Sequence, residues 1–87
     1  MKLHRTPRGW IEVILTEYEN AAHQFSPFHS AHEGFAILKE EVDELWEAVK
    51  LNQNNPLRRD AIEREAIQVG AMALRILYDC CKKGLLQ

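Results

Sequence analysis

Two pairs of oxygen-bearing side chains have the spacing of ligands for a metal ion. Glu41 and Glu44 are three residues apart, and the same spacing separates Glu65 from Gln68. Residues three apart are neighbours on one face of a helix, and both pairs lie at the edge of an apolar stripe. A carboxylate near a packed interior needs a partner, so this arrangement points to a cation between the two pairs.

If the two helices pack antiparallel, three carboxylates and one amide oxygen converge between them. Such an all-oxygen set suits Mg²⁺ or Mn²⁺, hard cations that keep bound water and share their remaining positions with phosphate groups. Arg75 lies about 10 Å beyond Gln68 along the helix, and Arg64 lies one turn before it, so both arginines are candidates to bind a phosphate tail. The residues alone leave an alternative open, in which the acids are solvated or paired with lysine and arginine side chains.

The middle of the chain is predicted to be a helix over about residues 30–52. Ser30 and Glu33 form a capping box at its start. An apolar heptad follows, and we expect it to pack against the other helices. The heptad consists of Phe35, Leu38, Val42, Leu45 and Val49.

Apolar stripes predict two further helices, one on either side. The first covers about residues 9–23 and ends before Pro27. The last covers about residues 56–83, with Pro56 as its first residue behind a capping asparagine and Gly84 as its C-cap. Short turns between the helices favour an antiparallel hairpin with an additional N-terminal helix.

The length and composition indicate a small all-α protein. Residues 1–87 are expected to form one domain, too short to cover the apolar stripes of its own helices. We therefore expect a homodimer or tetramer that completes a four-helix bundle by oligomerisation. The formal net charge of −2 gives no reason to expect duplex nucleic acid as a partner. No apolar run has the length of a membrane span or a signal peptide, so a cytoplasmic location without a membrane partner is expected.

At the paired acids, the chain resembles the all-α nucleoside triphosphate pyrophosphatases of the MazG type. That family carries the motif EExxE on one helix and ExxD on the next. The corresponding segments here are EEVDE over residues 40–44 and EAIQ over residues 65–68, and the resemblance extends from Ser30 to about Asp79. Gln68 replaces the aspartate of the motif, and its amide oxygen brings no charge to a metal. The resemblance implies that Mg²⁺, for which Mn²⁺ can substitute, is bound by Glu41, Glu44, Glu65 and Gln68.

The resemblance also implies a reaction. The family hydrolyses a nucleoside triphosphate between its α- and β-phosphates and releases a nucleoside monophosphate and pyrophosphate. Glu44 or Glu40 would then be the catalytic carboxylate that takes a proton from the attacking water, and Arg64 and Arg75 would bind the substrate. The alternative is a non-catalytic helical interaction module of the same fold, in which Gln68 has weakened metal binding.

Histidines and tryptophans suggest less specific sites. His23, His29 and His32 raise the possibility of zinc, but no cysteine lies near them and their spacing matches no standard zinc site. Surface or capping histidines are the ordinary interpretation. Trp10 and Trp46 are expected to be core or interface anchors rather than platforms on which a base stacks.

Overall fold

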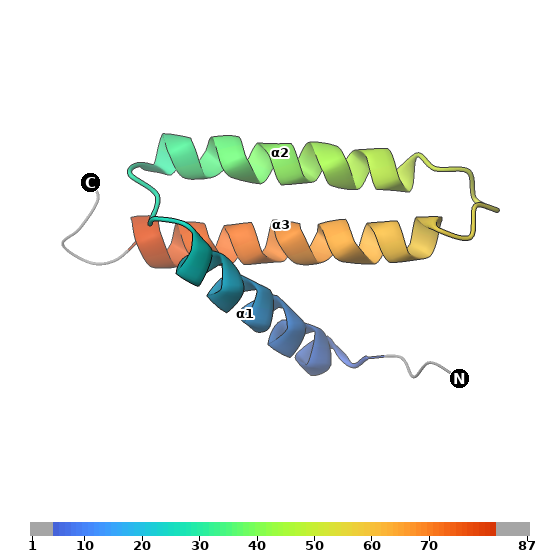
Figure 1. The fold of residues 1–87 in the computed structure, drawn as a ribbon, viewed down its shortest axis with the longest axis horizontal. Helices are drawn as coiled ribbons and strands as arrows, with labels where there is room; N and C mark the ends of the chain where they lie inside the picture. Colours follow the sequence, from blue (N-terminus) through green and yellow to red (C-terminus); the bar gives the residue numbers. More distant parts are fainter. Residues whose placement is uncertain (1–4, 82–87) are drawn as a thin grey trace.

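The computed structural model describes residues 5–81. These residues form three helices and no strand: α1 (Pro7–Gln24), α2 (Ala31–Val49) and α3 (Arg58–Cys80). Figure 1 shows α2 and α3 running antiparallel side by side, with α1 crossing α3 at an angle on its other side. Within this part of the chain, α1 and α2 each pack against α3 and not against each other. The prediction of an all-α fold is confirmed for the described residues, and none of their helices combines the length and apolar character needed to cross a membrane.

Side chains cap the first two helices at their starts. Thr6 Oγ1 accepts a backbone N–H of the first turn at 3.0 Å, so α1 begins at Pro7, slightly earlier than expected. Ser30 Oγ accepts a hydrogen bond from Glu33 N–H at 3.1 Å, and Glu33 Oε1 accepts one from His29 N–H at 2.7 Å. The predicted capping box is therefore present at the start of α2, with the glutamate reaching one residue further out.

The connection between α2 and α3 is longer than predicted. α2 ends at Val49 and α3 begins at Arg58, each a few residues inside the expected boundary. Asn52 Oδ1 and Asn55 Oδ1 each accept a backbone N–H two residues ahead at 2.8 Å. These side-chain turns compete with helical hydrogen bonding, so α3 starts only after the second of them. The predicted C-cap of the last helix, Gly84, lies outside the described residues.

The face of α2 that packs against α3 differs from the predicted one. Gly34 near the start of α2 and Ala48 near its end are buried, whereas Phe35 and Val42 of the expected heptad are 62% and 44% exposed. A Cβ added at Gly34 would lie 2.9 Å from Ile76 Cγ1, so glycine is what allows the close approach of the helices. Within the single chain the smallest residues set the line of contact with α3, so the exposed members of the predicted heptad are left without a packing partner there.

The connection between α1 and α2 contributes an aromatic ring to a small core. Phe28 is buried there with Ala21, Ala71 and Met72. Its backbone N–H donates to Asp79 Oδ2 at 3.0 Å, which ties the connection to α3. No large side chain of the described residues is completely buried, so the three helices of a single chain enclose little apolar volume.

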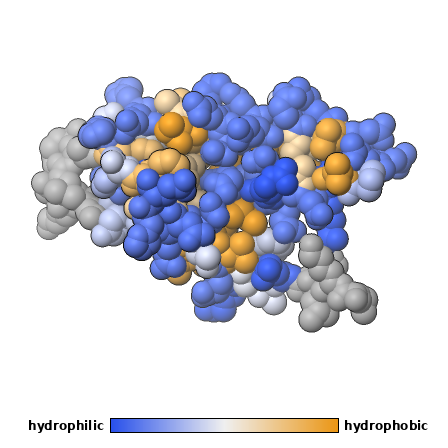
Figure 2. Space-filling model, viewed as in Figure 1, coloured by the Kyte–Doolittle hydropathy of each residue, from blue (hydrophilic) through white to orange (hydrophobic). Residues whose placement is uncertain are grey.

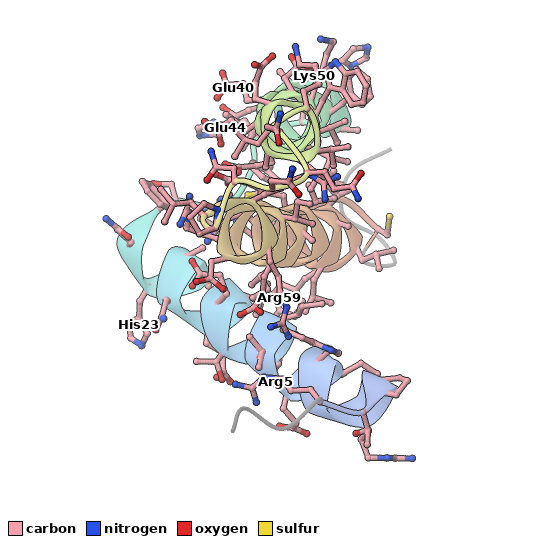
Figure 3. The ribbon with its side chains drawn as sticks, turned by 90° about the vertical axis from the view of Figure 1, so that its right-hand side faces the viewer. Arg5, His23, Glu40, Glu44, Lys50 and Arg59 are labelled. Carbon is pink, nitrogen blue, oxygen red and sulfur yellow. The ribbon has the colours of Figure 1, made fainter. Side chains whose placement is uncertain are left out.

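The two flanks of α2 differ in polarity. Glu40 and Glu44 project to one side of the layer of helices (Figure 3). That side faces the viewer in Figure 2 and is largely hydrophilic. The opposite flank of α2 carries apolar side chains. These residues lie about a quarter to a third of a turn around the helix from the residues that face α3. We call these residues, all at least 36% exposed, the apolar flank of α2: Phe35, Val42, Trp46 and Val49.

Candidate metal centre

Three glutamates converge where α2 lies alongside α3. Glu41 and Glu44 come from adjacent turns of α2, and Glu65 comes from α3. Each offers one carboxylate oxygen, and these oxygens lie within 4.8 Å of one another. Among residues 5–81, this is the only group of three or more acidic, histidine or cysteine side chains that meet in this way. The structure thus brings together the three acids that the sequence places on two separate helices.

The neighbouring carboxylates affect the titration of Glu41. Partial burial, a hydrogen bond with Glu44, and repulsion from Glu44, Glu65 and Glu40 raise the pKa of Glu41 to about 7. In the absence of a cation, the cluster therefore holds a proton near neutral pH. A divalent cation bound to the same oxygens would replace that proton and offset the repulsion. The all-oxygen donor set fits Mg²⁺ or Mn²⁺.

The raised pKa of Glu41 predicts a pH dependence of stability in the metal-free protein. The folded state binds this proton more tightly than the unfolded chain, in which the carboxyl has its usual pKa of 4.5. The resulting stabilisation is present below that pH and is lost as the pH rises through about 7. Glu41→Gln cannot ionise and should remove this part of the dependence. Thermal denaturation of both proteins from acidic to mildly basic pH measures the difference, and identical profiles would contradict the prediction.

The other predicted site residues near the cluster have different environments. Gln68 is half-buried and, together with Glu41, lines a cavity of about 330 Å³. Arg64 is exposed, and its Nε lies 3.7 Å from Glu65 Oε2. Glu40 is exposed on the outer side of α2 and influences Glu41 through its charge. The cluster remains open to solvent, since Glu44 is exposed and Glu41 and Glu65 are only half-buried.

Arg75 lies deeper than the sequence suggests. Arg75 is only 5% exposed to solvent, and its Nη2 donates a hydrogen bond to Ser26 O at 3.0 Å. The guanidinium carbon lies 4.1 Å from the centroid of the Phe28 ring. No carboxylate in the described part of the chain is within ion-pairing distance of this guanidinium. Buried arginines usually have an acid partner at short range. Here Arg75 acts on a carboxylate across the cavity instead, since its charge is one of the causes that lower the pKa of Glu33.

Several residues around Arg75 were not predicted from the sequence to belong to a functional site. Phe25 and Phe28 from the connection and Glu33 from α2 line the same cavity as Gln68. The two phenylalanines stand on either side of Ser26 and a helix-breaking proline, which is also typical of an ordinary capping segment, and Glu33 was predicted only as part of the capping box. Their placement depends on how the connection folds back onto α3.

The histidines and tryptophans do not belong to the glutamate cluster, and His29 lines the cavity that holds Arg75. His29 Nδ1 lies 3.5 Å from the carboxylate of the glutamate one turn further on, and His23 and His32 are exposed. Trp46 belongs to the apolar flank of α2, and Trp10 is half-buried on α1. None of these side chains contributes to the glutamate cluster.

Two features of the structure therefore carry the functional argument. One is the cluster of Glu41, Glu44 and Glu65, and the other is the adjoining cavity that holds Arg75. Comparisons of the chain with protein-family models, with curated proteins and with solved structures found no match.

Proposed function

We propose that the chain is a MazG-like, Mg²⁺-dependent nucleoside triphosphate pyrophosphohydrolase. The observation that carries this proposal is the convergence of Glu41, Glu44 and Glu65, whose carboxylate oxygens lie within 4.8 Å of one another. These are three of the positions at which the sequence resembles the metal-binding motifs of that family. Three carboxylates that converge in this way are suited to a hard divalent cation, and such cations commonly hold substrate phosphates.

The proposed reaction is hydrolysis of a phosphoric anhydride. The oxygen of a water molecule bonds to the α-phosphorus while the bond from this phosphorus to the bridging oxygen breaks. Pyrophosphate leaves with the electron pair of the broken bond. The cation, when bound, neutralises charge on the polyphosphate and on the leaving pyrophosphate. Glu44, which is exposed at the cluster, or Glu40 beside it accepts the proton that the water loses.

Polar side chains of α3 supplement the three carboxylates. Arg64 is exposed beside Glu65, at 3.7 Å, where rotation of its side chain would bring it to a phosphate group. Gln68 offers a neutral amide oxygen as a further metal ligand or as an acceptor for a water molecule. Gln68 lines the same cavity as Glu41, which supports its assignment to the proposed metal site.

We also propose that two chains associate through the apolar flank of α2. Phe35 and Trp46 of this flank are 62% and 57% exposed in the single chain. A second copy would cover them and complete a four-helix bundle from two α2–α3 hairpins, and two such dimers would give a tetramer. Because Glu40 and Glu44 project from the other side of α2, this association leaves the glutamate cluster accessible (Figure 3).

Incubation with a panel of common and modified nucleoside triphosphates and Mg²⁺ tests the proposed activity. We expect pyrophosphate release from at least one of them, and a loss of at least about a hundredfold in kcat/KM for Glu41→Gln. Glu47→Gln is the matched control, because Glu47 is also on α2 but is exposed and paired with Lys50 at 2.8 Å. Its activity should equal that of the native chain.

Failure of every triphosphate to release pyrophosphate would favour a non-catalytic helical interaction module. The observation that supports this alternative is the exposed apolar flank of α2, since a partner-binding helix presents the same kind of surface. Equal rates in the native chain and in Glu41→Gln would likewise show that the glutamate cluster is not an active site.

A further inference from the structure

We propose that the cavity around Arg75 binds the base of the nucleotide and selects bases that present an oxo group to this arginine. The proposal rests on the proposed function, and it assigns Arg75 to the base instead of the phosphate tail. The cavity has a volume of about 330 Å³ and lies between the end of α1, the connection to α2, and the facing sides of α2 and α3. This volume lies within the range of small-molecule sites.

The walls of the cavity suit a planar ring. Phe25, Phe28, Ile37 and Met72 supply apolar surface, and Gln24 adds an amide group. Phe28 is buried and fixed in the core, whereas Phe25 is 56% exposed, so part of its surface is open to a ligand. Stacking of a base on an aromatic side chain is favourable for every base. These residues therefore contribute affinity, and selectivity has to come from the polar groups.

The charges in the cavity disfavour a phosphate chain. Glu17, Glu33 and Glu41 line it, and Arg75 is the only lysine or arginine among the described residues that do so. Several negative charges of a polyphosphate would be repelled at short range by Glu17 and Glu33, which do not belong to the glutamate cluster. A neutral base does not incur this cost, so the cavity fits the base better than the tail.

Arg75 is held in place and has hydrogen-bond donors to spare. Ser26 O accepts one N–H at 3.0 Å, Met72 Sδ lies 3.8 Å from Nη1, and the Phe28 ring lies under the guanidinium. Arginine has five N–H donors and no acceptor. An oxo oxygen of a base would accept from one of the remaining donors, whereas an amino group in the same position would set donor against donor.

The position of Arg75 along α3 allows one nucleotide to reach both parts of the site. Arg75 and Glu65 are separated by about 15 Å along the helix axis. Glu41 and Gln68 line the cavity between them. An extended nucleoside triphosphate has a comparable length, so a base beside Arg75 brings the phosphates to the glutamate cluster.

Titration with inosine and adenosine, followed by chemical-shift changes in the nuclear magnetic resonance spectrum of the metal-free protein, tests the proposal. These nucleosides carry no phosphate and differ in having an oxo or an amino group at the same ring position. We expect inosine to bind at least about tenfold more tightly than adenosine. Equal affinities, or no binding of either nucleoside at millimolar concentration, would overturn the proposal.

Two variants and a control assign the preference to the cavity. Arg75→Met should abolish the preference for inosine. Phe25→Ala should lower the binding affinity for both nucleosides by about tenfold, because a stacking surface is lost. Arg59→Met is the control, since Arg59 is an exposed arginine of α3 on the side away from Glu40 and Glu44 (Figure 3). It should behave like the native chain.

Survival of the preference in Arg75→Met would overturn the proposal. If circular dichroism shows that Arg75→Met does not fold, Phe25→Ala decides, and undiminished affinity in that variant would reject the cavity as the base site. Preference for inosine in a chain that hydrolyses no triphosphate would retain the base site and reject the pyrophosphohydrolase. Pyrophosphate release without any nucleoside preference would retain the pyrophosphohydrolase and reject the base site.

Discussion

Replacement of Glu65 with alanine is expected to abolish the rise in melting temperature that Mg²⁺ or Mn²⁺ produces in the native chain. Glu65 is the only member of the glutamate cluster contributed by α3, so without it the two remaining acids lie on a single helix. A cation at a hundred times its dissociation constant stabilises the folded state by about 2.7 kcal/mol. For a domain of this size, that corresponds to a rise of about 10 to 20 °C. Differential scanning calorimetry with and without metal measures the effect.

The same experiment separates metal binding from a general effect on folding. Glu47→Ala removes an exposed acid of α2 outside the cluster and should keep the full metal-induced rise. In the absence of metal, the melting temperature of Glu65→Ala should fall by no more than the truncation of a half-buried side chain causes, because the mutation also relieves repulsion between Glu65 and Glu41. An undiminished rise in Glu65→Ala would remove Glu65 from the metal site.

Trp46→Glu is expected to convert an oligomer into a monomer. Trp46 is 57% exposed on the apolar flank of α2. If an interface buries this position, the substitution places a charged side chain in the core of that interface. We expect the dimer dissociation constant to rise by at least about a hundredfold. The melting temperature should also fall at micromolar concentration, because association stabilises the folded state by mass action. Sedimentation velocity measures the oligomeric state directly.

Trp46→Phe is the matched control, since it retains an aromatic ring on the same flank and should remain associated. The neighbouring Glu47→Ala, on the acidic side of the helix, should also remain associated. A native chain that is a well-folded monomer at micromolar concentration would show that the apolar flank of α2 is not an interface between two copies.

Short-range patterns account for the helices of this chain and for the pairing of its acids. Ser30 and Glu33 mark the start of α2 because both ends of the capping box lie within one helical turn. Glu41 and Glu44 share a face of that helix whatever the rest of the molecule does, since their relation depends only on helical geometry. Glu65 stands out because an acid beside an apolar stripe needs a partner. The glutamate cluster could therefore be anticipated from residue types and spacing alone.

Contacts between distant segments decided which face of α2 is buried and how deep Arg75 lies. An apolar heptad marks a stripe that can pack, but it does not say which residues meet a particular neighbour. Gly34 lies on the α3-facing line of α2 because only a residue without a side chain leaves room there for Ile76 of α3. Arg75 is likewise buried by Ser26 and Phe28, which lie far from it in the sequence. Periodicity along one helix describes angles around its own axis, whereas burial depends on the shapes of the segments that come to lie beside it.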